Sequence, residues 1–198
     1  MAKLIFRYST MFSGKSAEIL QIYKNYERQN IKGICLIPSV DTASDGYIRS
    51  RFSDITIPAI KVKPDTNIID LILEIKDLKF IIIDESNFLK KEQVDQLGTI
   101  VDYFDIDVMA YGLTTDFQGH LFEGAKRLIE IADKVEKIYV RSRCECGKTA
   151  IFNARFINGI FSNEGDNIVI DKNKKANTTS SVVYIPLCRK CYNKYRQK

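Results

Sequence analysis

The chain has 198 residues, a net charge of +5 and 45% hydrophobic residues, values typical of a globular protein with one ordinary domain and a small appendage. No apolar run approaches the roughly 20 residues of a membrane span, and the N-terminus lacks the small-residue cleavage site of a signal peptide. We therefore expect a cytoplasmic protein that does not enter a membrane.

Strand and helix patterns alternate through the first 112 residues. Short apolar runs predict strands, and apolar residues recurring every three or four positions predict helices. The expected strands are 3–8, 34–38, 55–62, 80–83 and 108–112, the expected helices are 15–28, 67–76 and one around Val94, Leu97 and Val101, and residues 39–53 are expected to form a polar loop. This order predicts an α/β fold with a parallel sheet covered by helices on both faces.

Ligands of such sheets bind beyond the carboxyl ends of the strands. Four segments follow strand ends and should converge there: 9–16, 38–45, 84–88 and 113–117. In the first of them, Gly14-Lys15-Ser16 stands between a strand and a helix, as in a phosphate-binding loop, although Ser9 replaces the usual first glycine. Backbone N–H groups at the helix start, the Lys15 ammonium and the Ser16 hydroxyl predict a site for nucleotide phosphates and Mg²⁺.

Two adjacent acids, Asp84 and Glu85, end the wholly apolar run Phe80–Ile83. A carboxylate at this strand end faces the phosphate loop and can hold Mg²⁺, while a second can serve a substrate hydroxyl. The simpler interpretation is a strand-end Asp that caps a turn. Lone His120 has no partner in the sequence, and we interpret it as a surface residue.

Four of the five cysteines form the pattern C-x-C, forty-one residues, C-x-x-C. Four thiolates at tetrahedral positions make a closed, structural Zn²⁺ site. The predicted ligands are Cys144, Cys146, Cys188 and Cys191, whereas Cys35 lies in an apolar run and is expected in the core. The strand–helix alternation stops near residue 141, so we expect two parts, 1–141 and 142–198, the second stapled by zinc.

Four segments together resemble the cytosolic type-II thymidine kinases, closest to their enterobacterial branch. They are Tyr8-Ser9-Thr10-Met11-Phe12-Ser13-Gly14-Lys15-Ser16, Asp84-Glu85-Ser86-Asn87-Phe88, Tyr111-Gly112-Leu113-Thr114-Thr115-Asp116-Phe117 and Cys188-Arg189-Lys190-Cys191-Tyr192. The enterobacterial branch also carries serine at the first loop position and the C-x-C pair. The resemblance covers nearly the whole chain.

The resemblance implies a RecA-like P-loop core with a C-terminal zinc-ribbon subdomain, and a homotetramer. It implies transfer of the γ-phosphoryl group of ATP to the 5′-hydroxyl of thymidine or deoxyuridine, with Glu85 as general base and Ser16 and Asp84 at Mg²⁺. The implied ATP-binding residues are Ser9, Thr10, Met11, Phe12, Ser13, Gly14, Lys15, Ser16, Asp84 and Asn87. The implied nucleoside-binding residues are Met11, Phe88, Leu113, Phe117, Asn153 and Tyr184.

The chain departs from the family pattern at two places. Asp41-Thr42-Ala43 keeps the acid of an Asp-x-Arg motif without its arginine, for which Arg49 and Arg51 are candidate replacements. The lasso, the loop that closes over the base, has Ile170-Asp171-Lys172 where the family has Ile-Gly-Gly, and it is about eight residues longer before Tyr184.

These departures leave a second hypothesis, a deoxynucleoside kinase of the same fold with altered or weak activity. A third hypothesis is a P-loop and zinc-ribbon protein that binds nucleic acid through the basic residues 171–198. Residues 171–181 lack the interleaved aromatic residues that stack on bases, so we interpret them as a solvated loop and do not expect nucleic acid as a partner.

Overall fold

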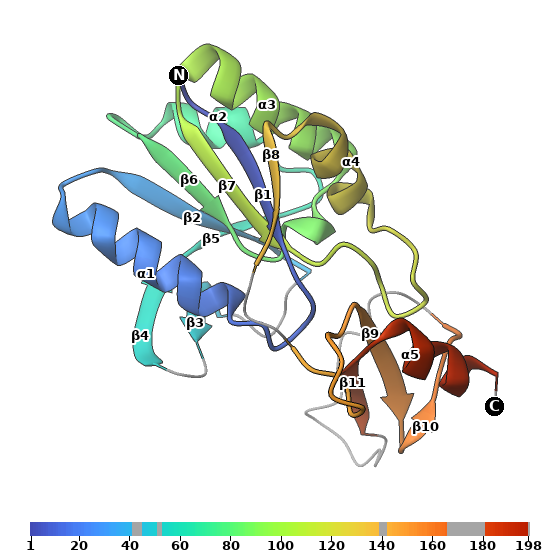
Figure 1. Ribbon diagram of the computed structural model, residues 1–198. Coiled ribbons are helices and arrows are strands. Elements are labelled where there is room, and N and C mark those ends of the chain that lie inside the picture. Colours follow the sequence, from blue (N-terminus) through green and yellow to red (C-terminus); the bar gives the residue numbers. More distant parts are fainter. Residues whose placement is uncertain (41–44, 51–52, 139–141, 166–180, 198) are drawn as a thin grey trace.

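The computed structural model describes residues 1–40, 45–50, 53–138, 142–165 and 181–197. We call residues 1–138 the six-stranded region and residues 142–197 the three-stranded region, after their principal sheets (Figure 1). The elements of the first are β1 (Leu4–Tyr8), α1 (Lys15–Arg28), β2 (Gly33–Pro38), β3 (Tyr47–Ser50), β4 (Ser53–Pro58), β5 (Ile60–Val62), α2 (Ile68–Leu73), β6 (Phe80–Ile83), the 3₁₀ helix η1 (Ser86–Phe88), α3 (Lys91–Phe104), β7 (Asp107–Gly112), α4 (Glu123–Ile131) and β8 (Lys134–Lys137). Those of the second are β9 (Phe152–Ile157), β10 (Ile160–Phe161), β11 (Val182–Leu187) and α5 (Arg189–Arg196).

The main sheet has the strand order β5-β2-β6-β7-β1-β8, and every neighbouring pair is parallel. Parallel neighbours need crossover connections, which here are mostly helices, so their carboxyl ends meet at one edge of the sheet. This confirms the parallel α/β sheet expected from the sequence. The central strands β1, β6 and β7 therefore deliver the segments that follow them to one place.

Helices cover both faces of this sheet (Figure 1). On one face α2, α3 and α4 pack through buried side chains such as Ile72, Leu97 and Leu128. On the other face α1 packs through Ile19 and Leu20, together with the β3–β4 hairpin. The strand β6 is buried along its whole length, because it is covered from both sides.

Several sequence expectations for residues 39–62 were wrong. The polar loop expected over 39–53 contains β3 and the start of β4, which pair as an antiparallel hairpin. The single strand expected over 55–62 is split between that hairpin and β5, which joins the main sheet. Among the described hairpin residues, only Ile48 and Ile57 have buried apolar side chains, so the apolar signal there was short. Residues 41–44 and 51–52 lie outside the described residues.

The three-stranded region has the antiparallel order β10-β9-β11, with α5 against it. Its core is small and aromatic, with Phe156 and Tyr192 buried and Phe152 stacked on Tyr192 at 4.5 Å between ring centroids. Residues 139–141, where we expect the boundary between the two parts, lie outside the described residues, so the division at 141 stays a proposal. Among the described helices, none combines the length and the apolar character that crossing a membrane requires.

Candidate functional site

The loop between β1 and α1 has the geometry of a phosphate cradle. Gly14 is the N-cap of α1 and has φ 84°, a left-handed conformation that a glycine adopts without strain. As a glycine it offers no side-chain cap, so the first N–H groups of α1 stay available to a ligand. Lys15 is buried, and its Nζ lies 3.3 Å from the Thr10 carbonyl oxygen. A buried ammonium beside uncapped N–H groups is an anion site.

Two serine hydroxyls brace the inside of this loop. The Ser9 and Ser13 hydroxyls are hydrogen-bonded to each other, and both residues are buried. Ser9, at the position of the missing first glycine, therefore fills the turn with a polar side chain that finds its partner within the loop. Phe12, in contrast, is exposed at φ 60°, and Met11 is half-buried.

The acids at the end of β6 lie against this loop. The Ser16 hydroxyl donates to Asp84 Oδ2 at 3.3 Å, and Asp84 is buried. Neighbouring oxygen ligands of an octahedral Mg²⁺, at 2.0–2.1 Å from the metal, stand about 3.0 Å apart. The two oxygens therefore fit adjacent positions on one such cation.

Glu85 has a left-handed backbone, with φ 50° and ψ 35°. This conformation is uncommon for a residue with a side chain and costs on the order of 1–3 kcal/mol, and such strain gathers at functional sites. The Glu85 N–H donates to Asp84 Oδ1 at 2.9 Å, which fixes the turn between the two acids. This bond lies between the backbone of one acid and the side chain of the other.

Asn87 joins η1 to the end of β7. Its Oδ1 accepts the Leu113 N–H at 3.0 Å, and a Cβ added to Gly112 would lie 2.8 Å from the same oxygen. Ser86 Oγ donates to the Tyr111 carbonyl at 2.8 Å, and the Ser9 N–H donates to the Gly112 carbonyl at 3.3 Å. The segments after β1, β6 and β7 are thus hydrogen-bonded to one another.

Residues 113–122 form a compact loop beyond β7. Asp116 Oδ1 accepts the N–H groups of Gln118 and His120, both at 2.9 Å, and His120 is exposed, as expected. Leu113 and Phe117 are buried. The half-buried Phe88 meets Phe122, the last residue of the loop, edge to face at 5.3 Å between ring centroids.

The three-stranded region reaches the phosphate loop at Met11. The Met11 N–H donates to Asn153 Oδ1 at 2.8 Å, and the Ser142 hydroxyl donates to the Met11 carbonyl at 2.9 Å. Tyr184 of β11 is half-buried and pairs with Arg155 of β9. Asn153 and Tyr184, both expected at the nucleoside, thus belong to neighbouring strands of one sheet.

The four paired cysteines form a single cluster. The sulfur atoms of Cys144, Cys146, Cys188 and Cys191 all lie within 4.8 Å of one another, and the Cys146 and Cys188 sulfurs are 3.6 Å apart. Tetrahedral ligands at about 2.3 Å from Zn²⁺ have their sulfurs about 3.8 Å apart. The donor set and its spacing therefore fit a structural zinc site.

Protonation of these thiols follows from their crowding. The backbone N–H of Cys191 stabilises the Cys188 thiolate and lowers the pKa of that thiol to about 7, with help from the neighbouring thiols. The Cys144 and Cys146 groups raise the pKa of Cys191 to about 12. Four adjacent thiolates repel one another, so a bound cation is what allows all of them to ionise.

The fifth cysteine, Cys35, is not part of this cluster. Its burial, and to a lesser degree the nearby Asp84, raise the pKa of its thiol to about 12, so it stays a neutral core residue as expected.

Two residues that contact Phe117 were not identified from the sequence. Arg155 lies over the Phe117 ring, and the Tyr192 hydroxyl donates to the Phe117 carbonyl at 2.6 Å. The position of Tyr192 directly after the predicted zinc ligand Cys191 was the one signal available. The acid at Asp41, the candidate Arg51 and the lasso residues 170–172 lie outside the described residues.

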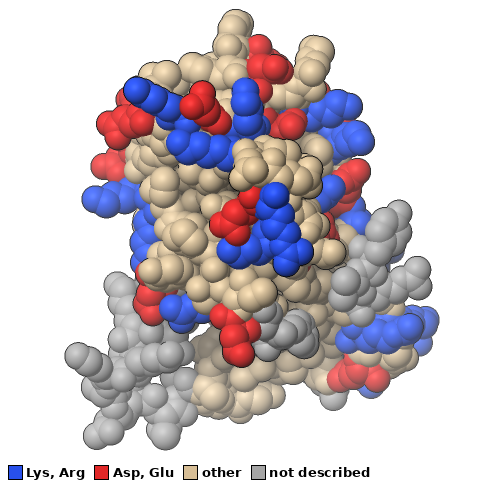
Figure 2. Space-filling view, turned by 90° about the vertical axis from the view of Figure 1, so that its left-hand side faces the viewer, with Lys and Arg blue, Asp and Glu red and all other residues tan. Residues whose placement is uncertain are grey.

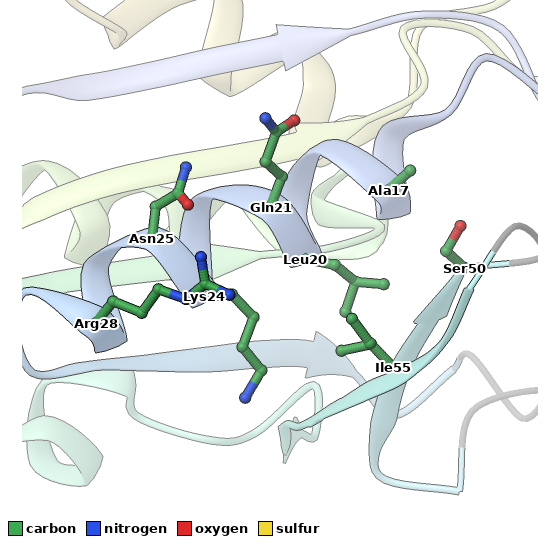
Figure 3. A pocket seen from close by; sticks show the side chains of 8 residues that line it. All are labelled: Ala17, Leu20, Gln21, Lys24, Asn25, Arg28, Ser50 and Ile55. Atoms are coloured by element: carbon green, nitrogen blue, oxygen red, sulfur yellow. The ribbon is translucent and has the colours of Figure 1, made fainter.

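Arg49, the other candidate for the missing arginine, is exposed on β3. Its guanidinium is 4.0 Å from the Asp45 carboxylate. A cavity of about 310 Å³ lies between α1 and the same hairpin (Figure 3). All of its described lining residues belong to α1 and the hairpin: Ala17, Leu20, Gln21, Lys24, Asn25, Arg28, Ser50 and Ile55. None of them belongs to the acids after β6 or to the loop of Phe117.

Residues 2–192 match the family model described as thymidine kinase. The chain is 39% identical to a thymidine kinase of Enterobacteria phage T4 over 100% of this chain and 99% of that protein. It is 37% identical to one from Streptomyces avermitilis, over 96% and 88%, and 38% identical to one from Streptococcus pyogenes serotype M3, over 97% of each. Among solved structures, the Pif1 helicase from Candida albicans superposes with a TM-score of 0.41 at 16% identity, over 69% of this chain and 36% of that one, too loosely to bear on function. Because the family model and these relatives span nearly the whole chain, it belongs to the thymidine kinase family.

Proposed function

We propose that this chain transfers the γ-phosphoryl group of ATP to the 5′-hydroxyl of thymidine or deoxyuridine. The observation that carries the proposal is the meeting of Ser16, Asp84 and Glu85 beside a buried lysine, in a chain of the thymidine kinase family. Phosphoryl transfer needs positioned phosphates, neutralised charge and a base at the acceptor hydroxyl. Each of these requirements has a candidate residue within this arrangement.

The ATP phosphates bind along the loop from Ser9 to Ser16. The N–H groups at the start of α1 and the Lys15 ammonium hold the phosphate oxygens, and their positive charge stabilises the charge that develops during transfer. Ser16 and Asp84 hold Mg²⁺, which supplies further charge neutralisation when bound. Asn87 supports this end of the site through its bond to the Leu113 N–H.

Glu85 acts as the general base at the nucleoside. Its carboxylate accepts the proton of the 5′-hydroxyl as that oxygen attacks the γ-phosphorus, and the left-handed turn at Glu85 supports a functional role for this residue. The base of the nucleoside lies among Met11, Leu113 and Phe117, with Phe88, Asn153 and Tyr184 completing the pocket. Apolar walls there exclude water from the transferred group.

The direct test is product formation. Zinc-loaded protein with ATP and Mg²⁺ is expected to convert thymidine to thymidine monophosphate, measured by chromatography, and to act on deoxyuridine more than on cytidine or purine nucleosides. No monophosphate from thymidine, at one zinc per chain, would refute the proposal. Activity on another nucleoside alone would support the second hypothesis, a kinase of altered base preference.

Nucleic-acid binding is the competing function, and a salt titration separates it from catalysis. On the face shown in Figure 2, cationic and anionic side chains are interspersed instead of forming a patch of one sign. We therefore propose that this chain binds nucleosides and ATP and not nucleic acid. We also propose that it forms a homotetramer. Binding to DNA that weakens steeply with salt, in protein that releases no monophosphate, would favour the alternative. Light scattering tests the tetramer, and a monomeric mass would contradict it.

A further inference from the structure

Arg155 on β9 is an unusual residue for a small region with an aromatic core. It is 1% exposed and is the largest of the fully buried side chains among the described residues. Arginine is almost never fully buried unless its charge is compensated, because removing a cation from water is costly. A buried arginine therefore indicates a specific task at the place where its guanidinium lies.

The guanidinium lies on an aromatic ring of the other region. Its central carbon is 3.6 Å from the centroid of the Phe117 ring. One of its nitrogens donates to the Ser162 hydroxyl at 3.3 Å and to the Glu164 carbonyl oxygen. A guanidinium stacked in this way keeps its N–H groups in its own plane, so they can donate hydrogen bonds while its face covers the ring. A lysine ammonium has no such planar face.

The register of β9 explains why this contact falls beside the phosphate loop. Asn153 and Arg155 are two residues apart, so they point to the same face of the strand. Asn153 accepts the N–H of Met11 in the phosphate loop, while Arg155 covers Phe117. Tyr184, directly opposite Arg155 on β11, shares that face. One face of this sheet thus contacts both the phosphate loop and the nucleoside pocket.

The backbone of Phe117 is held separately from its ring. The Tyr192 hydroxyl donates to the Phe117 carbonyl at 2.6 Å, and the Gln118 side chain donates to the Asn163 carbonyl at 2.9 Å. These bonds fix where the loop lies, and neither of them acts on the buried ring itself. The stacked guanidinium lies directly on one face of the ring, where it favours one orientation of the ring plane.

We propose that Arg155 is a positioning residue that sets the plane of the Phe117 ring as a wall for the nucleoside base. This inference rests on the proposed function, because it takes Phe117 as part of the nucleoside pocket. Arg155 touches neither phosphate nor the reacting oxygen. Its removal should therefore weaken nucleoside binding, with a smaller effect on turnover and none on ATP.

The first experiment compares Arg155→Met and Arg155→Lys with wild type and with Arg196→Met, the same change at an exposed arginine of α5. Arg155→Met is expected to raise the KM for thymidine about tenfold or more, the scale of a desolvated cation–π contact, with the KM for ATP and the zinc content unchanged. Arg155→Lys should recover part of the loss, and Arg196→Met should match wild type. Equal increases in both KM values would overturn the proposal.

A second variant separates the effect on Phe117 from general damage. In a Phe117→Leu background the ring is absent, so adding Arg155→Met should change the KM for thymidine by less than about twofold. If Arg155→Met acts equally with and without the Phe117 ring, the proposal is wrong. Should Arg155→Met lose its zinc, Arg155→Lys decides, because a wild-type KM there would also contradict the stacking role.

A readout without turnover keeps this proposal distinct from the proposed function. In protein labelled with 4-fluorophenylalanine, the fluorine resonance that disappears in Phe117→Leu reports the Phe117 ring. Arg155→Met should shift or broaden that resonance, and Arg196→Met should leave it unchanged. An unshifted resonance refutes the role of Arg155 even if wild type phosphorylates thymidine. A shifted resonance in protein that makes no monophosphate would refute the proposed function alone.

Discussion

The six-stranded and three-stranded regions are stabilised in different ways. The first buries two apolar layers, one on each face of a parallel sheet. The second has one small buried cluster, which consists mainly of two thiols of the candidate zinc site and several aromatic rings. A region of that size depends on a metal staple. The loss of zinc should therefore affect the second region far more than the first.

The contacts between the two regions concentrate on Met11 and Phe117. Asn153 and Ser142 hold the backbone of Met11, while Arg155 and Tyr192 hold Phe117. In contrast, Lys15, which we propose binds phosphate, and Asp84 after β6 make their described contacts within the six-stranded region. In our proposal the phosphate site therefore belongs to one region, whereas the nucleoside site is built by both.

The largest expected effect falls within the six-stranded region. Glu85→Gln should lower kcat by roughly 10²–10⁴-fold, because the amide cannot accept the proton of the 5′-hydroxyl. The fold and the KM for ATP should be unchanged. Stopped-assay kinetics measures this, with Glu92→Gln at an exposed acid of α3 as the control. An unaltered kcat would mean that Glu85 is not the general base.

Removing one zinc ligand should break the other region. Cys146→Ser should weaken zinc binding by about 3 kcal/mol, a quarter of the roughly 10–16 kcal/mol that four ligands supply together. Thermal unfolding should then show an early transition of the three-stranded region. Cys35→Ser is the matched change in the six-stranded core, where a buried hydroxyl should cost about 1–3 kcal/mol without loss of zinc. Equal zinc loss in both variants would contradict this division.

A smaller effect is expected where η1 meets β7. Gly112→Ala places a methyl group 2.8 Å from Asn87 Oδ1 and 3.0 Å from the Asn87 backbone nitrogen, which should destabilise the fold by about 1–3 kcal/mol. Gly98→Ala, within helix α3, is the control, because its methyl group would make an ordinary 3.5 Å contact with Ile131 of α4. There alanine should stabilise by about 0.5–1 kcal/mol. Chemical denaturation measures both changes, and equal signs would refute the crowding argument.

The smallest effects concern ion pairs of the six-stranded region. Arg7 bonds to Glu18, Glu136 and Tyr111, so Arg7→Met should cost about 1–2 kcal/mol of unfolding free energy. Lys24→Met, which removes an exposed pair with Glu27, should cost less than about 0.5 kcal/mol. Denaturant midpoints distinguish the two. A Lys24 effect as large as that of Arg7 would contradict the assignment.

Sequence patterns predicted the central strands and α1 well, because burial on both faces or on one stripe leaves a clear apolar signature. The β3–β4 hairpin, α4 and β8 were not anticipated. In α4 only Gly124, Ala125 and Leu128 are buried, and two of these are too small to mark an apolar face. No buried residue marks β8, an edge strand of the sheet. Weakly apolar elements take their place from tertiary pairing.

The site was predictable where a motif is local and unpredictable where it is assembled. Lys15, the acids after β6 and the paired cysteines each belong to short patterns with a chemical reason. The contact between Arg155 and Phe117 joins residues of two regions, and no spacing in the sequence reveals it. A buried arginine in an antiparallel strand looks, in sequence, like an outward-facing one.

The claim that two regions share the nucleoside site is tested most directly by titrating thymidine and ATP, in separate calorimetric experiments, into zinc-loaded and zinc-stripped protein. We predict that stripping zinc weakens thymidine binding at least about tenfold, because Phe117 loses the hold of Tyr192, while ATP affinity changes by less than about threefold. Unchanged thymidine affinity, or an equal fall for both ligands, would contradict the account.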